Sequence, residues 1–217
     1  MKKFAIYFLL LSSITFLFSC IKNEDVVFTG SVAELDGATW NANAVNVTYP
    51  ILTRVPADGR ALTSSCPDST LRRFSRTIRL RVNLVGPQSA KEETVGYKTF
   101  SSPIDSTAFP ATLFFGASNA CKQIPEINSA PLPSSPGAPP TPRLFVSNAV
   151  AGTHYNITSP AGKVIIPANS SFGYIDIQIL NQGSSAQGRF LGIQLDETGS
   201  LKPNFNYSQV GLVIDQR

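Results

Sequence analysis

The residue with the most definite chemistry is Cys20, which ends the segment Leu17-Phe18-Ser19-Cys20. Two lysines precede an apolar run over residues 4–18, which is short for a membrane-spanning helix of ~20 residues. This pattern is typical of a secretory signal with a small residue at its cleavage point. The thiol that follows can accept a diacylglyceryl group. We therefore predict a lipoprotein signal peptide at 1–19 and a lipidated tether at 20–25; the alternative is an ordinary signal peptide with an incidental cysteine.

The two remaining cysteines, Cys66 and Cys121, could form one disulfide bond. An exported chain meets an oxidising compartment, where an even pair of cysteines is commonly joined. Closing a loop of this length would stabilise the fold by roughly 3–4 kcal/mol in the chain-entropy view. The alternative is two free buried thiols, because nothing in the sequence shows that they meet.

No pattern in the sequence predicts a catalytic or metal site. His154 is the single histidine, which excludes a metal site built from several histidines. It lies inside a Gly-x-x-Tyr segment, where we interpret it as a turn residue. The acidic pairs Glu92-Glu93 and Asp196-Glu197 are adjacent, so on a strand their members would point to opposite faces. We predict that the protein is not an enzyme and needs no cofactor or metal.

Trp40 is a candidate ligand contact, because Asn41 and Asn43 follow it closely. An exposed indole beside amide groups suits a sugar, which can stack on the ring and hydrogen-bond to the amides. The alternative is a tryptophan in the core.

Arg79 and Arg81 are a second candidate, two residues apart on a predicted strand. This spacing places them roughly 7 Å apart on one face of a sheet. Their guanidinium groups could bind uronate, sulfate or lipid phosphate. The alternative is a solvated outer face of the sheet, whose charges also discourage another strand from pairing with the sheet edge.

The charge of the chain does not favour nucleic-acid binding. Cleavage after Ser19 would remove two of 18 basic residues and leave 14 acidic ones, a net charge of about +2. Nucleic-acid binding would require a clustered basic footprint instead.

The elements that must position these residues are predicted to be short strands. In Thr77–Val85 the apolar side chains alternate with polar ones, so one face of the strand is apolar. We expect Thr94–Phe100 to pair with it. Further strands are predicted at Val26–Val32, Ala44–Tyr49, Lys163–Pro167, Phe172–Leu180, Arg189–Leu195 and Ser208–Ile214, with a turn at Leu35-Asp36-Gly37. No window shows a sustained helical repeat, so we predict one all-β domain over 26–217, an antiparallel immunoglobulin-like β-sandwich.

A proline-rich insertion interrupts this pattern at about 119–142. The range Pro125–Pro142 contains seven prolines, both ends included. Proline cannot donate a hydrogen bond to a sheet, so this segment is predicted to be a loop.

The segments Ala149–Tyr155, Val164–Ser171 and Ile175–Ile179 together resemble the pattern of Calx-beta-like and related immunoglobulin-type domains. We expect Gly152 either to allow a close approach of neighbouring backbone or to adopt a positive φ. We expect Pro167-Ala168-Asn169 to form a turn. Calx-beta domains bind calcium through gathered carboxylates, often adjacent aspartates. This sequence has no such aspartate pair nearby, so we do not expect calcium.

Such domains are common in lipoproteins of Bacteroidota, many encoded beside starch-utilisation-type glycan uptake systems. The resemblance implies a lipid-anchored outer-membrane protein that captures glycan. The alternative is a structural or adhesive module that contacts other envelope proteins. Lys22-Asn23-Glu24-Asp25 is similar to a surface-export signal, with Asn23 interrupting it, so we expect the cell surface rather than the periplasmic face.

Overall fold

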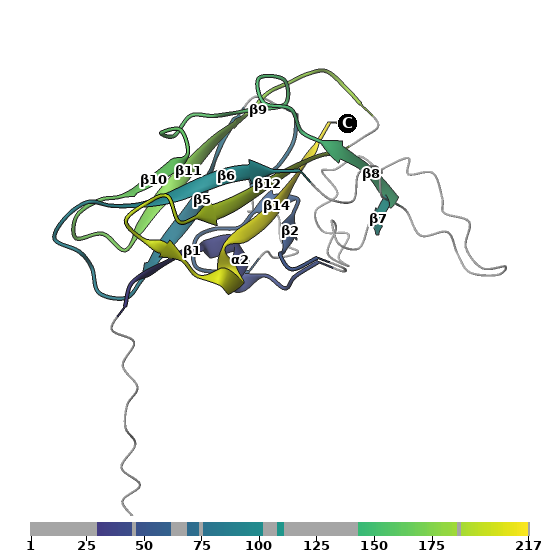
Figure 1. Ribbon diagram of the computed structural model, residues 1–217. Helices are drawn as coiled ribbons and strands as arrows, with labels where there is room; N and C mark the ends of the chain where they lie inside the picture. The colour runs from purple at the N-terminus through teal and green to yellow at the C-terminus, as the bar shows by residue number, and fades with distance from the viewer. Residues whose placement is uncertain are drawn as a thin grey trace, which may run out of the picture.

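The computed structural model describes residues 30–44, 47–61, 69–73, 76–101, 108–110, 143–185 and 188–216. Two β-sheets pack face to face across one main apolar core (Figure 1). Within the described ranges, no helix is long and apolar enough to cross a membrane. The chain is a β-sandwich, as its alternating pattern predicts.

The first sheet has five strands in the order β13-β1-β5-β11-β9. Their bounds are Lys202–Pro203 (β13), Val32–Leu35 (β1), Arg76–Val85 (β5), Phe172–Ile179 (β11) and Tyr155–Ile157 (β9). Strands β5 and β11 are antiparallel along their whole contact, from Phe172 opposite Asn83 to Ile179 opposite Arg76. Strand β1 lies on the other side of β5, also antiparallel.

The second sheet follows the order β10-β6-β12-β14-β2, and β8 also pairs with β12. The bounds are Lys163–Ile166 (β10), Glu93–Phe100 (β6), Gly188–Asp196 (β12), Gln209–Asp215 (β14), Ile51–Leu52 (β2), Arg143–Asn148 (β8) and Ala108–Pro110 (β7), which pairs with β8. A separate pair joins Arg54–Val55 (β3) to Ser69–Thr70 (β4). The pairs β1–β13, β12–β8 and β14–β2 are parallel, so the sandwich is mixed rather than purely antiparallel.

The expected pairing of Thr77–Val85 with Thr94–Phe100 is wrong. Strand β5 lies in the first sheet and β6 in the second, where β6 pairs with β10 and β12. The chain turns at Gly86, whose φ is +124°, and then crosses to the opposite layer. Each strand has an apolar face, and the two faces meet across the core instead of lying side by side in one sheet.

The core confirms the alternation of apolar residues in the strands. The buried side chains of the two sheets form one cluster. From the first sheet they include Ile78, Leu80, Val82, Ile175, Ile177 and Ile179; from the second they include Val95, Val164, Leu191, Ile193, Leu195, Val210, Leu212 and Ile214. Burial of an aliphatic side chain of this kind contributes about 1.5–3 kcal/mol, so this cluster is the main source of stability.

A smaller apolar cluster covers the outer face of the second sheet. The rings of Tyr49, Phe100 and Phe190 contact one another, with centroid distances of 5.2–6.3 Å. A Cβ on Gly192 would lie 2.5 Å from the Phe100 ring, and one on Gly211 would lie 2.6 Å from the Phe190 ring. Both glycines therefore make room for an aromatic ring to approach the backbone of the sheet closely.

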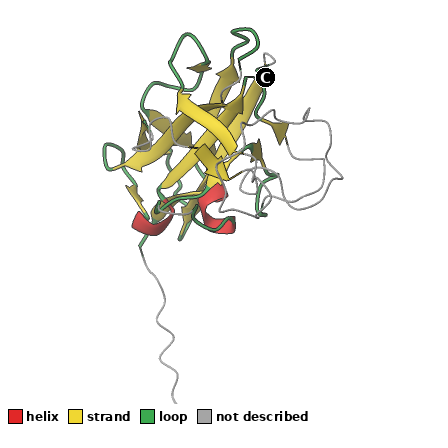
Figure 2. Ribbon diagram, turned by 90° about the vertical axis from the view of Figure 1, so that its right-hand side faces the viewer, coloured by secondary structure: helices red, strands yellow, loops and turns green. Residues whose placement is uncertain are grey.

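The N-terminal part of the sandwich differs from the prediction. Leu35-Asp36-Gly37 is not a turn, because the helix α2 begins at Asp36 and runs over Asp36–Trp40. Residues 44 and 47–49 are not in a strand; the N–H of Ala44 instead donates to the carbonyl of Tyr49 across a loop. A 3₁₀-helix, η4, spans Phe205–Tyr207. The two helical segments, red in Figure 2, lie at the same end of the sandwich.

The turns of the 149–171 segment are confirmed. Gly152 has a φ of +75° in the turn before β9, and Tyr155 is buried in the main core. Asn169 has a φ of +59°, and its N–H donates to the carbonyl of Ser89 at 2.8 Å. Asparagine tolerates this left-handed conformation better than most residues.

Several predictions concern residues outside the described ranges. These are the signal peptide and tether, Cys20, the proposed Cys66–Cys121 disulfide, and the proline-rich insertion.

Candidate functional site

A groove lies between α2, η4 and the outer face of strands β12 and β14. Its volume is about 830 Å³, within the range of roughly 300–1,000 Å³ typical of ligand sites. Its lining is aromatic or carries uncharged polar groups, apart from two alanines. The lining residues are Ala38, Thr39, Trp40, Asn41, Ala42, Asn43, Thr48, Gln194, Phe205, Asn206, Tyr207, Ser208 and Gln209.

Trp40 forms one wall of the groove, at the end of α2. Ala38 packs into the core, so the helix has one buried face and Trp40 is on the other, with 51% of its surface exposed. Two side chains donate hydrogen bonds to backbone carbonyls of the helix. Thr39 donates to the carbonyl of Asp36 and Asn41 to that of Gly37, both at 2.8 Å. Trp40 is therefore an exposed residue, and the alternative of a tryptophan in the core is wrong.

The start of α2 is held by the buried carboxylate of Asp36. It accepts a hydrogen bond from the N–H of Gly59 and another from the side-chain amide of Asn83, each at 2.8 Å. Because Asn83 belongs to β5, the helix is tied to the central strand of the first sheet. This arrangement positions Trp40.

The opposite wall is η4, which presents two aromatic side chains. Phe205 is 92% exposed and Tyr207 is 37% exposed. Asn204 fixes the start of this turn: its side-chain oxygen accepts from the N–H of Asn206 at 3.1 Å, and its own N–H donates to the carbonyl of Ala33 at 2.8 Å. Four aromatic residues of the described chain are exposed, and three of them line this groove.

The floor carries two amides from neighbouring strands. Gln194 in β12 lies directly opposite Gln209 in β14. Partners in an antiparallel sheet have Cβ atoms about 4.5–5.5 Å apart, so the two amides can bind neighbouring groups of one ligand. The groove thus combines apolar rings on its walls with hydrogen-bonding groups on its floor.

The predicted arginine site lies elsewhere, on the outer face of the first sheet. Arg79 donates to Asp176 at 2.9 Å, and its guanidinium lies 3.9 Å from the centre of the Tyr174 ring. The side chain remains exposed. The side chain of Arg79 lies on a solvated face, as the alternative predicts, but β5 is the central strand of its sheet, so the arginines do not protect a sheet edge from pairing.

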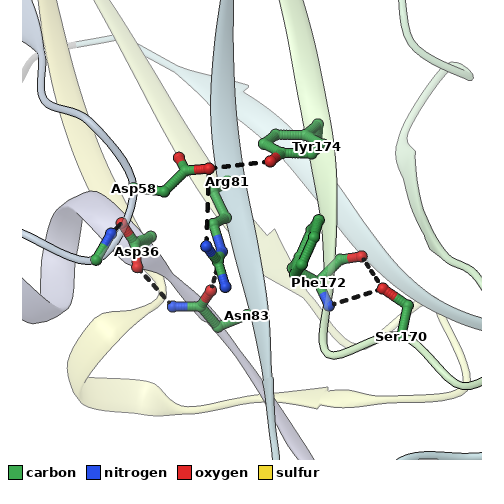
Figure 3. A network of polar contacts seen from close by, with 8 residues as sticks. Asp36, Asp58, Arg81, Asn83, Ser170, Phe172 and Tyr174 are labelled. Carbon is green, nitrogen blue, oxygen red and sulfur yellow. Dashed lines mark hydrogen bonds and ion pairs between the residues drawn. The ribbon is translucent and has the colours of Figure 1, made fainter.

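Arg81 is more closely enclosed (Figure 3). It donates to the side-chain oxygen of Asn83 at 2.7 Å, lies 3.7 Å from the Asp58 carboxylate and stacks over the Phe172 ring at 4.3 Å. The Tyr174 hydroxyl donates to the same carboxylate at 2.9 Å; burial, followed by this contact with Asp58, raises the pKa of Tyr174.

This network connects to the groove through shared residues. Arg81 contacts Asn83, Asn83 contacts Asp36, and Asp36 begins the helix that carries Trp40 (Figure 3). The two sites predicted from the sequence are therefore linked, with Arg81 acting on the position of α2 rather than lining the groove.

Sequence reasoning missed the second wall and the floor. Asn204-Phe205-Asn206-Tyr207 alternates amide and aromatic residues, much as Trp40-Asn41-Ala42-Asn43 does, and this similarity is the signal that could have revealed it. The two glutamines carry no such signal, because alternating polar residues are found on any exposed strand face.

His154 lies where the sequence places it, in the turn before β9. Its side chain is buried, and Nδ1 accepts a hydrogen bond from the N–H of Val150 at 2.9 Å. Burial lowers the pKa of His154, and the nearby charge of Arg189 lowers it further. Both effects favour the neutral imidazole.

No family model matches the sequence, and no curated protein is similar to it, so the resemblance to Calx-beta-like domains stays a prediction. A Bacteroides ovatus structure, described as a candidate carbohydrate binding protein, aligns with 65% of this chain and 32% of its own, with 8% identity and a TM-score of 0.36. Another Bacteroides ovatus structure, of unknown function, aligns with 87% of this chain and 52% of its own, with 10% identity and a TM-score of 0.44. At such scores, function must be argued from the groove itself.

Proposed function

We propose that this chain is a non-catalytic, lipid-anchored envelope protein that binds glycan in the groove between α2 and η4. The observation that supports the proposal is the half-exposed Trp40 facing a groove that also contains Phe205 and two floor amides. Exposed aromatic side chains that gather in one groove with polar groups around them commonly mark a binding site.

A sugar ring suits this lining better than an apolar ligand does. One face of a pyranose is rich in C–H groups, which pack on an aromatic ring, while its hydroxyl groups need hydrogen-bonding partners. Trp40 and Phe205 offer the rings, and Gln194 and Gln209 offer the partners. A purely apolar ligand would leave these amides desolvated without partners, at a cost of about 1–3 kcal/mol each.

The alternative is an adhesive module that pairs with other envelope proteins through its sheet edges. The strands at the ends of the two sheets, β13, β9, β10 and β2, have two, three, four and two residues. Short edge strands are one way in which proteins avoid such pairing. We therefore favour the glycan.

Affinity electrophoresis in gels that contain single polysaccharides tests the proposal. We expect one polysaccharide to retard the protein, and Trp40→Ala to weaken its binding about tenfold or more, which corresponds to ~1.4 kcal/mol. Val150→Ala is the control, because it shortens an apolar side chain that is 54% exposed and lies outside the groove. Equal loss of binding in both variants, or no retardation by any polysaccharide, would contradict the proposal.

The proposed anchor is tested separately. In cells given labelled palmitate, we expect the full chain to become labelled and Cys20→Ser to remain unlabelled, because serine offers no thiol to acylate. Protease added to intact cells then tests the proposed position on the cell surface: degradation of the protein supports it, and protection indicates the periplasmic face.

A further inference from the structure

We infer that the groove selects an uncharged glycan, one without uronate, sulfate or amino groups. This inference rests on the proposed function and narrows it. None of the lining residues that the structure describes is Asp, Glu, Lys, Arg or His. A glycan carboxylate or sulfate would lose part of its hydration here without gaining a cation, which is unfavourable in a partly desolvated site.

The carboxylates of β1 and α2, the elements that lead to Trp40, are already engaged. Glu34 is buried and accepts a hydrogen bond from Asn204 at 2.6 Å. Asp36 is also buried and accepts from Gly59 and Asn83. Because both carboxylates point into the protein and are satisfied there, they do not offer a negative surface to an amino sugar.

The two arginines predicted to bind an acidic glycan lie on a different surface, while Lys98 in β6 pairs with Gln194 without lining the groove. Arg79 and Arg81 project from the outer face of the first sheet, whereas the groove floor is the outer face of the second. Asp176 and Asp58 also lie within 4 Å of these two guanidinium groups. An acidic chain in the groove therefore has no access to them.

The floor amides match hydroxyl groups in particular. A side-chain amide both donates and accepts, and so does a sugar hydroxyl. Neither the Gln194 nor the Gln209 side-chain amide takes part in a hydrogen bond with another described residue. Both can therefore bind neighbouring hydroxyls of one sugar or of two linked sugars.

A matched pair of charge variants tests the inference. Gln209→Glu and Gln209→Lys place opposite charges at one point of the floor. Binding of the wild-type chain and both variants is measured against neutral polysaccharides (xylan, mannan, galactan, glucan) and acidic ones (homogalacturonan, alginate, chondroitin sulfate). Each measurement is made at about 20 mM and about 500 mM NaCl, which changes the screening length severalfold.

For an uncharged ligand we expect tightest binding to a neutral polysaccharide, a salt effect below about twofold, and a similar loss in both variants, because no ligand charge distinguishes them. Preferred binding of an acidic polysaccharide, with Gln209→Lys tighter than wild type and the affinity falling about tenfold or more in high salt, would overturn the inference. If Trp40→Ala abolishes that acidic binding, the proposed function stands and only the inference fails. If no polysaccharide of either set binds, both fail.

Discussion

The side-chain amide of Asn204 donates a 2.6 Å hydrogen bond to the carboxylate of Glu34, and this contact joins the two walls of the groove. Glu34 lies in β1, which leads directly into α2. Asn204 directly precedes η4 and caps it. The two residues are 170 positions apart in the chain, so the relative placement of Trp40 and Phe205 depends on tertiary contacts.

Asn204→Ala is expected to weaken both the fold and the groove. It leaves the buried Glu34 carboxylate without this donor, which costs about 1–3 kcal/mol. Urea unfolding measures that loss, and glycan titration measures the accompanying fall in affinity. Asn206→Ala serves as the control for stability, because that side chain is exposed. An unchanged unfolding midpoint in Asn204→Ala would show that the hydrogen bond between Asn204 and Glu34 does not hold the two walls of the groove together.

Phe205→Ala is expected to lower glycan affinity without lowering stability. The side chain is 92% exposed, so its removal takes almost no buried surface from the folded protein. The free energy of unfolding should stay within about 0.5 kcal/mol of wild type, as for other exposed substitutions. Thermal unfolding and affinity electrophoresis are measured on the same preparation. A large drop in melting temperature would mean that Phe205 is a structural residue instead.

The two arginines should differ from each other. Arg79→Ala removes an exposed ion pair with Asp176, which is worth about 0–1 kcal/mol, and it should leave glycan affinity unchanged. Arg81→Ala also removes the donor to Asn83 and should cost more, about 1–3 kcal/mol. Chemical denaturation of both variants tests whether Arg81→Ala loses more stability than Arg79→Ala. Equal stability of the two variants would contradict the role of Arg81 in holding α2.

Gly192→Ala should destabilise the smaller cluster. The new Cβ would lie 2.5 Å from the Phe100 ring, which must then move. Overpacking of this kind costs about 1–3 kcal/mol. In the Phe100→Leu background the same substitution should cost less, because the smaller side chain leaves space. A double-mutant cycle measured by urea unfolding checks this coupling, and strict additivity would argue against it.

The stability of the protein should fall on mild acidification through His154. Its pKa in the folded state lies below the ordinary 6.5, chiefly because the ring is buried. The unfolded chain therefore takes up this proton at a higher pH than the folded one does. The contribution of His154 to the free energy of unfolding is present above pH 6.5. It is lost as the pH falls through the lowered pKa of the folded state. Urea unfolding between pH 7.5 and 5.5 should show a smaller decline in His154→Gln; identical declines would exclude this histidine as the cause.

The strands could be predicted from the sequence because their signal is local. In β5 and β11 the apolar residues alternate with polar ones, and a period of two is set by the strand itself. Which strands pair is not a local property. Glu93–Phe100 has an apolar face that suits a neighbour of β5 as well as it suits the opposite sheet, and only the crossing after Gly86 decides between them.

The helix α2 could not be predicted, because five residues show no periodicity and a single helical turn is unstable alone. Its stability comes from the two donors to Asp36 and from Ala38 in the core. The exposure of Trp40 follows from the same contacts. The residues near Trp40 were enough to suggest a sugar contact, but not to show whether the ring would face water.

What the sequence alone determined is which faces are apolar, and hence that the chain forms a two-layered β fold. It also determined that Trp40 has amides for neighbours. The tertiary structure decided that Phe205, Gln194 and Gln209 meet Trp40 in one groove, and that Arg81 supports the wall instead of lining the site. The physical reason is that side-chain periodicity is set by neighbouring residues, whereas a groove is set by contacts such as Glu34 with Asn204, which no local pattern records.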